Sequence, residues 1–167
     1  MVQDAVVSIK TTPAIGQRTI NQDNANKAMS AEIQCSFEKA LVSGANECAQ
    51  ARRVEIGERI VCLCRSPEAA RRCERYLSLL RKNARFVFRQ IRSADSILSN
   101  YQELCLQCGG LQGLSAISCN AQENGKRDVN ILLQTTEDQY GDFENIPMDQ
   151  IVPRIAAYNP RPHRKRK

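Results

Sequence analysis

The segment spanning residues 61–91 constrains the fold most, because it joins a cysteine pair to a long amphipathic pattern that carries a third cysteine. Ser66 is a favourable N-cap, since its hydroxyl can accept a hydrogen bond from a free N–H group of the first helical turn. Pro67 suits the first helical position, where its missing N–H group would have no helical partner. Apolar residues then recur with a helical period, and neither Gly nor Pro interrupts the pattern before Arg92. These features predict one long helix over residues 67–91, with a last turn that can fray near Phe86.

Shorter patterns elsewhere also favour helices, with Asp128 as an N-cap and Gly44, Gly57 and Gly141 as stops. Residues 58–64 are apolar and β-branched enough for a strand, and they serve equally well as an extended lead-in to the long helix. The other segments expected to be helical are 36–42, 47–55, 97–104, 111–117, 129–139 and 147–158. The predicted fold class is therefore all-α, a small helical domain built on one long amphipathic helix, with any strand confined to the cysteine-rich half.

The chain of 167 residues is most simply one domain with extensions at both ends. Residues 1–30 are rich in Gln, Asn, Thr, Ser and Ala and are predicted to form a mobile N-terminal arm. Residues 31–158 are expected to form the helical cysteine-rich domain, and residues 159–167 a basic C-terminal tail. No apolar run approaches the roughly 20 residues of a membrane span, and the N-terminus lacks the pattern of a signal peptide. We therefore expect a cytoplasmic protein without a membrane span.

The chain has 8 cysteines and a single histidine, His163, which lies in the basic tail. In a reducing cytoplasm, cysteines serve metals or redox chemistry more often than structural disulfides. The spacing is C-x12-C-x13-C-x-C-x8-C-x31-C-x2-C-x10-C, which contains one C-x-x-C knuckle and no ferredoxin run. An iron–sulfur cluster tolerates such irregular spacing, because its ligands can come from separate elements. The predicted cofactor is an iron–sulfur cluster of the 4Fe–4S type, and the alternative is zinc.

The preferred ligands each lie beside the end of a predicted element or on an inward stripe. A site anchored by Cys64 and Cys73 would lie near the N-terminus of the long helix, where free N–H groups stabilise thiolates. The glycine pair after Cys108 would let backbone N–H groups approach an inorganic sulfide, and an ordinary tight turn is the alternative interpretation. Cys73 alone is equally well explained as a small buried apolar side chain. The predicted metal ligands are Cys35, Cys64, Cys73 and Cys108, with Cys48 as the alternate, and Cys62, Cys105 and Cys119 as buried thiols.

Three functional hypotheses follow from this cysteine pattern. The preferred one is a thiolate-ligated iron–sulfur protein that acts in electron transfer, or as an accessory to a redox enzyme, with a redox protein or enzyme complex as its partner. The alternative is a zinc-stapled interaction module without redox activity that binds an acidic partner or nucleic acid. The third is a helical adaptor whose cysteines are core residues. An enzymatic role has little support, because the sequence lacks G-x-S-x-G, P-loop and G-x-G-x-x-G motifs.

The net charge of +6 is unevenly distributed, since the last seven residues supply five of the positive charges. For this tail, a solvated segment is the simpler interpretation, and contacts with nucleic-acid phosphates are the alternative. A basic stripe on the predicted long helix comprises Arg71, Arg75, Lys82, Arg85 and Arg89. We expect it to be neutralised within the fold rather than by a partner, by the acidic residues Glu137, Asp138, Asp142, Glu144 and Asp149.

Two pieces of the chain carry a resemblance to other proteins. The pieces CRSPEAARRCERYLSLLRKNARFVF and LQCGGLQGL resemble segments of small, uncharacterised cysteine-containing bacterial proteins. The resemblance covers roughly residues 35–158 and leaves out the arm and the tail. It implies a compact bacterial domain and no particular activity.

Overall fold

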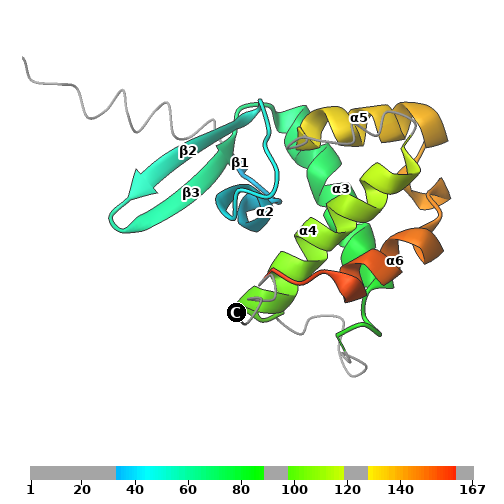
Figure 1. Cartoon of the computed structure of the whole chain (residues 1–167). Helices are drawn as coiled ribbons and strands as arrows, with labels where there is room; N and C mark the ends of the chain where they lie inside the picture. Colours follow the sequence, from blue (N-terminus) through cyan, green and yellow to red (C-terminus); the bar gives the residue numbers. More distant parts are fainter. Residues whose placement is uncertain (1–32, 89–97, 119–127, 161–167) are drawn as a thin grey trace, which may run out of the picture. The chain divides into compact units, whose positions relative to one another are not determined.

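The computed structural model describes residues 33–88, 98–118 and 128–160, and within these ranges the chain combines helices with a β-sheet (Figure 1). The predicted arm 1–30, residues 161–167 of the tail, Arg89 and Cys119 lie outside the described residues. The elements are β1 Ile33–Gln34, α2 Glu38–Val42, β2 Ala51–Ile56, β3 Arg59–Cys64, α3 Pro67–Asn83, α4 Asn100–Ile117, α5 Val129–Tyr140, the short 3-10 helix η1 Phe143–Asn145 and α6 Met148–Ala157. The all-α prediction is wrong, because the described residues include a three-stranded antiparallel sheet.

A β-hairpin replaces the helix that was predicted for residues 47–55. Strands β2 and β3 pair antiparallel from Ala51↔Cys64 to Ile56↔Arg59, so that only two residues remain for the turn. Gly57 in this turn has φ +62°, a left-handed conformation that two-residue hairpin turns require and that glycine adopts without strain. The strand option for residues 58–64 is confirmed as β3. Gly57 therefore reverses the chain between two strands and does not end a helix.

Helix α3 begins where the sequence predicts and ends earlier. The side chain of Ser66 accepts a hydrogen bond from the N–H of Ala69 at 3.2 Å, which confirms the predicted N-cap and the start at Pro67. The helix ends at Asn83, and beyond it the side chain of Phe86 is 83% exposed. Val87 and Phe88 still pack partly buried against the core, although the chain around them is no longer helical. The prediction of a helix continuing to residue 91 is therefore wrong by at least one full turn.

Helix α4 is the second long helix, and it runs through the middle of the helical part in Figure 1. The sequence predicted a short helix, a glycine turn and a second helix in this region. The structure instead has one continuous helix of 18 residues, capped by a reciprocal pair of hydrogen bonds between Ser99 and Gln102. Leu106, Leu111 and Leu114 on this helix are each at most 1% exposed. A helix that is apolar on several sides belongs in the interior of the fold, so α4 and not α3 is the central element.

Glycines on α4 allow close contact with two neighbouring helices. A Cβ atom added to Gly109 would lie 2.6 Å from the Cα of Ile155, and one added to Gly113 would lie 2.9 Å from the Cα of Ile151, both in α6. A Cβ atom on Gly110 would overlap the side chain of Leu80 in α3. The glycine pair therefore serves helix packing, in place of the sulfide contact or tight turn expected from the sequence.

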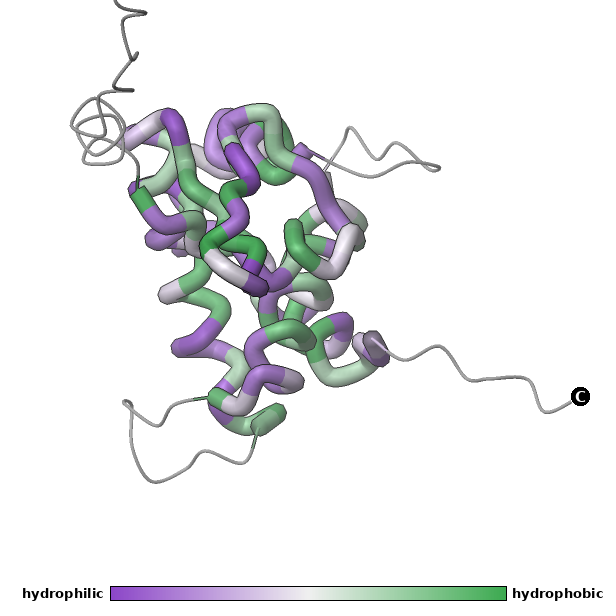
Figure 2. Tube along the Cα trace, turned by 90° about the vertical axis from the view of Figure 1, so that its left-hand side faces the viewer, coloured by the Kyte–Doolittle hydropathy of each residue, from purple (hydrophilic) through white to green (hydrophobic). Residues whose placement is uncertain are grey.

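Hydrophobic and hydrophilic residues are interspersed along the trace in Figure 2. Among the described residues, no helix combines the length and the apolar composition needed to cross a membrane.

The predicted neutralisation of the basic stripe is confirmed for Arg75. Its guanidinium lies 2.8 Å from a carboxylate oxygen of Glu137 and 3.1 Å from one of Asp142. Arg72, which was not assigned to the stripe, also pairs with Glu137 at 2.8 Å. Arg71 and Lys82 line an open surface groove of about 600 Å³ whose wall also includes Asp142 and Glu144. Arg72 and Arg75 of α3 are therefore balanced mainly from α5 and the turn that follows it, whereas Arg81 pairs with Glu103 of α4.

We expect Gly109→Ala to lower the free energy of unfolding by about 1–3 kcal/mol, because the added methyl group would overlap the backbone of α6. A destabilising effect of this substitution is unusual, since Gly→Ala inside a helix ordinarily raises the free energy of unfolding by about 1 kcal/mol. Urea unfolding would measure the change. Gln112→Ala, at an exposed position of the same helix, is the control and should change stability little. A neutral or stabilising Gly109→Ala would contradict the close packing of α4 on α6.

We expect Glu137→Gln to lower the free energy of unfolding at neutral pH by about 1–2 kcal/mol, since one partly buried carboxylate binds two guanidinium groups. The hydrogen bond from Arg72, and then that from Arg75, lowers the pKa of Glu137. The stabilisation is therefore present above the unfolded pKa, about 4.3, and is lost as the pH falls through the folded pKa.

Urea unfolding at several pH values would show the difference between parent and Glu137→Gln closing in acid. Asp138→Asn removes a neighbouring, exposed carboxylate for which no ion pair is recorded among the described residues, and it should have little effect. A difference that stays constant down to about pH 3 would mean that the charge of Glu137 is not what stabilises this contact.

Candidate metal centre

Four cysteines from four different segments line one small cavity. Cys35 follows β1, Cys48 lies in the loop before β2, Cys64 ends β3, and Cys73 lies in the second turn of α3. The cavity has a volume of about 10 Å³, which is about the space that one water molecule or one ion needs. The remaining lining is mostly apolar and consists of Ser36, Phe37, Leu41, Ala51, Ala69, Ala70 and Val129.

Strand register explains why three of these cysteines come together. Cys64 pairs with Ile33 of β1 on one side and with Ala51 of β2 on the other. Cys35 lies two residues beyond Ile33, and its N–H donates to the carbonyl oxygen of Cys62 at 2.9 Å. The N–H of Ala51 donates to the carbonyl oxygen of Cys48 at 3.0 Å, in a tight turn just before β2. The ends of all three strands therefore meet at Cys64.

Helix α3 supplies the fourth cysteine. Ser66 starts the helix two residues after Cys64, so the chain turns directly from the sheet into the helix. Cys73 lies on the buried stripe of α3, where its side chain is 7% exposed. Local caps and strand pairing are therefore sufficient to bring the four side chains to one place.

Backbone N–H groups lie near two of the four sulfur atoms. Burial raises the pKa of Cys35 and of Cys48, and the N–H of Phe37 beside Cys35 and those of Gln50 and Asn130 beside Cys48 partly offset this rise. Donors of this kind stabilise a thiolate and orient a ligand that binds a metal. The thiol of Cys64 instead donates to the carbonyl oxygen of Ser66 at 3.3 Å.

Burial raises the pKa of Cys35, Cys48 and Cys73 and so disfavours their charged forms. Burial, and then the charges that Cys48, Cys62 and Cys64 would carry, raises the pKa of Cys35 to about 12. Burial is also the main cause of the raised pKa of Cys73, and the next causes are Cys35, Cys48 and Cys64. These three thiols thus stay neutral at pH 7 unless a cation offsets the negative charge of the thiolates, and a bound divalent ion would supply two positive charges for this.

Metal binding would require small movements of these side chains. Among the described residues, no group of three or more His, Cys, Asp or Glu side chains is arranged as it stands to hold a metal ion. Tetrahedral zinc needs each sulfur about 2.3 Å from the ion, so the thiols would deprotonate and rotate inward, and Cys64 would leave the carbonyl of Ser66. Four sulfur donors without a nitrogen donor suit a thiophilic ion such as Zn²⁺. The donor set and the cavity size fit that ion.

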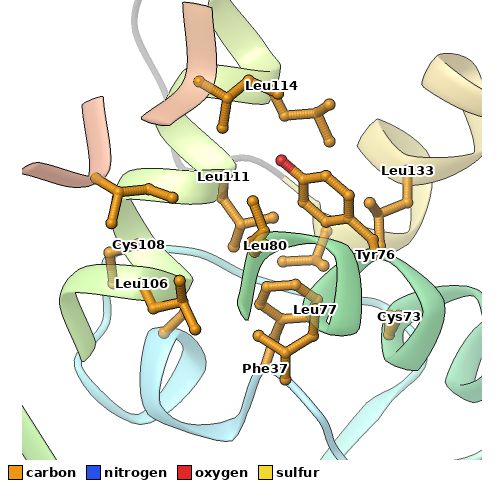
Figure 3. Close-up of a cluster of buried hydrophobic side chains, with 14 of the residues drawn as sticks. Phe37, Cys73, Tyr76, Leu77, Leu80, Leu106, Cys108, Leu111, Leu114 and Leu133 are labelled. Atoms are coloured by element: carbon orange, nitrogen blue, oxygen red, sulfur yellow. The ribbon is translucent and has the colours of Figure 1, made fainter. Parts of the chain in front are cut away.

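The structure brings together three of the predicted ligands and the alternate, and it leaves out Cys108. Cys108 lies on α4 with its sulfur 3.9 Å from the hydroxyl of Ser43, and Figure 3 places Cys73 and Cys108 on opposite sides of the buried cluster. Cys62 is buried on β3 beside Glu38 and Arg53, away from the cavity lining. The other described cysteine, Cys105, donates from its thiol to the carbonyl oxygen of Tyr158 at 3.6 Å. All seven described cysteines are free thiols.

Recognition of the hairpin would have found Cys48 from the sequence. A turn at Gly57 and Glu58 folds β2 back along β3 and brings the residues just before β2 level with Cys64. Cys108 was predicted as a ligand because it lies beside the end of an expected element and because the two glycines after it would let backbone N–H groups approach an inorganic sulfide. In α4 the same residues are part of a continuous helix, so no knuckle forms.

Comparison of the chain with protein-family models, with curated proteins and with solved structures finds no match. The functional argument therefore depends on the geometry and chemistry of the four cysteines.

We expect the chelated, reduced protein to lose stability as the pH rises above about 9, because Cys35 and Cys73 ionise less readily when folded. A raised folded pKa gives stabilisation that is complete below the unfolded pKa and is lost as the pH rises toward the folded value. The measurement is the melting temperature between about pH 8 and about pH 11. The double variant Cys35→Ser/Cys73→Ser should lose less over this range, and an equal loss would contradict the shifted pKa values.

Proposed function

We propose that this chain is a zinc-stapled interaction module, in which Cys35, Cys48, Cys64 and Cys73 bind one Zn²⁺ as thiolates. The observation that carries the proposal is the meeting of four cysteines, from four separate segments, around one cavity of single-ion size. Bound zinc would offset two of the four negative charges of the thiolates, and it takes no part in electron transfer. The metal would join the ends of the three strands to the first turns of α3.

Cavity size favours a single zinc ion over an iron–sulfur cluster. A 4Fe–4S cluster is a cube of iron and sulfide that is several times larger than one ion. The cavity of about 10 Å³ is closed by side chains that include Phe37, Leu41 and Val129. These side chains would have to move outward to admit a cluster, whereas an ion needs only rotations of the cysteine side chains. The iron–sulfur hypothesis is therefore the less supported of the two metal hypotheses.

Weak apolar packing at this place supports a structural role for the metal. Cys64, Ala69 and Ala70 form a buried cluster of their own, apart from the main hydrophobic core. Side chains this small bury little apolar surface, so they contribute little to holding the sheet on α3. Small domains with too little core are commonly stabilised by a metal or a disulfide, and zinc binding to ligands that exist only in the folded chain stabilises folding directly.

Metal analysis of the full chain, purified under reducing conditions with zinc present, tests this proposal. We expect one zinc per chain in the parent, and a loss of zinc together with a lower melting temperature in Cys48→Ser and Cys73→Ser, since a structural site needs all four ligands. Cys108→Ala is the matched control, because it also alters a buried cysteine and should keep its zinc.

Retention of zinc by Cys48→Ser, or its equal loss from Cys108→Ala, would contradict this ligand set. Iron with acid-labile sulfide in anaerobically purified protein, together with absorbance near 400 nm, would replace the zinc proposal by the iron–sulfur one.

A further inference from the structure

The outer edge of β2 carries backbone groups for which the described residues provide no partner. The strand order β1-β3-β2 puts β2 at one edge of the sheet. The N–H of Arg65 donates to the carbonyl oxygen of Gln50 at 2.9 Å, so these two residues form a hydrogen-bonded pair of the ladder. Hydrogen-bonded and non-bonded pairs alternate in an antiparallel ladder. The polar backbone groups of Arg53 and Glu55 therefore point away from β3.

Cys62, which lies opposite Arg53 in the ladder, confirms this alternation. Its N–H donates to a carboxylate oxygen of Glu38 at 3.2 Å, and its carbonyl oxygen accepts from Cys35, so both groups point away from β2. No backbone hydrogen bond of Arg53 or Glu55 to another part of the described chain is recorded. An edge strand of this kind is a template for pairing with a further strand.

The side chains along this edge are complementary to a second copy in one register only. Outward-pointing residues must face outward-pointing residues, which restricts a symmetric antiparallel pairing of two β2 strands to a few registers. Registers centred on Arg52, Arg53 or Glu55 place that charged residue opposite itself, and like charges directly opposite destabilise. The register centred on Val54 places valine opposite valine, and it places Arg53 opposite Glu55 on both sides of the two-fold axis.

The apolar face of the hairpin would continue across this axis. Val54 pairs with Val61 in the ladder, so both lie on one face of the sheet. Ile56, two residues further along β2, shares that face and is 55% exposed. Directly opposite residues lie on the same face of an antiparallel pair, so the apolar strips of two copies would join. The guanidinium of Arg53 has several N–H donors, and one of them donates to the carbonyl oxygen of Leu41 at 2.6 Å. Other donors of the same group therefore remain for Glu55 of the second copy.

We propose that two copies of this chain associate through β2, with Val54 on the two-fold axis and with Arg53 of each copy opposite Glu55 of the other. The two three-stranded sheets then form one continuous six-stranded antiparallel sheet. This proposal does not rest on the metal, because strand pairing within the hairpin sets the orientation of the β2 edge.

Mass measurement by light scattering on the full chain, over a concentration series, tests the association. We expect the parent to reach twice 18.7 kDa, and Glu55→Arg and Arg53→Glu each to remain at 18.7 kDa alone, because each places like charges opposite one another. An equimolar mixture of the two variants should recover the dimer, since arginines of one chain then face glutamates of the other. Glu58→Arg makes the same charge change in the hairpin turn, outside the pairing, and should stay dimeric.

The proposal is overturned if the parent stays at 18.7 kDa throughout, if Glu55→Arg is as dimeric as the parent, or if the mixture of folded variants does not recover the dimer. A monomeric parent whose Arg53 and Glu55 amides resist hydrogen exchange would assign the edge to another part of the same chain. Val54→Arg is a second test if Arg53→Glu does not fold. It places two arginines opposite each other on the two-fold axis, so it should give a folded monomer. Zinc content should be unchanged in Glu55→Arg, which separates this test from that of the metal.

Discussion

The close contact of α4 with α6 and α3 is the constraint on which the rest of the structure depends. Gly109 and Gly113 let the backbone of α6 approach the backbone of α4, and Gly110 makes room for Leu80 of α3. Interiors are packed as densely as organic crystals, so a helix in the middle of the fold determines where its neighbours can lie. Figure 1 shows α3, α5 and α6 arranged around this helix. Glycines in α4 weaken the helix locally, and the packing that they permit offsets that cost.

Polar contacts from the same helix hold one wall of the candidate metal centre. Gln107 donates to the carbonyl oxygen of Ser36 and accepts from the N–H of Ala40, each at 3.1 Å, so it binds both ends of the turn that follows Cys35. The amide nitrogen of Gln107 also donates to a carboxylate oxygen of Glu103 at 2.9 Å, which orients the Gln107 side chain. The same carboxylate oxygen pairs with the guanidinium of Arg81 at 2.8 Å. Buried networks of this kind specify one arrangement when every member has a partner. The position of Cys35 therefore depends on α4, although the two are far apart in the sequence.

Aromatic packing connects the core to the same wall. Tyr76 of α3 is fully buried, and its hydroxyl donates to the carbonyl oxygen of Gly110 at 3.0 Å. Its ring lies 6.2 Å from that of Phe37, which lines the cavity, and 5.5 Å from that of Phe143. Aromatic pairs at such distances contribute about 1 kcal/mol beyond the area they bury. The cavity thus has one rigid side formed by the core and one side formed by the sheet.

Local signals in the sequence predicted helix ends well, because a cap depends on only a few neighbouring residues. Ser66 and Asp128 cap α3 and α5 as expected, and Gly44 and Gly141 adopt the positive φ angles expected of stops. Properties that depend on distant residues were not predicted. The end of α3 at Asn83 is one such property, and Val87 and Phe88 pack against the core without being helical.

The glycines of α4 are explained only by α6, which follows them by about 40 residues. For the same reason, only part of the candidate centre could be predicted from the sequence. Cys64 and Cys73 belong to one local strand-to-helix unit, whereas Cys48 joins them through hairpin pairing.

The seven described cysteines differ in their surroundings, and this difference sets four of them apart as a candidate site. Cys108 contacts the hydroxyls of Ser43 and Tyr158, and Cys105 contacts the carbonyl of Tyr158, so each behaves as a buried thiol with a neutral polar partner. The four cysteines around the cavity share its lining with mostly apolar side chains, and the thiol of Cys64 also donates to the carbonyl oxygen of Ser66.

Neutral thiols gain little from such clustering, since a small apolar side chain would fill the same space without a polar atom to satisfy. A shared cation would make the clustering favourable. Thiolates attract a cation more strongly at short distance and where little water is present. This difference between neutral thiols and metal-bound thiolates supports the proposal that the clustered cysteines are ligands of one ion.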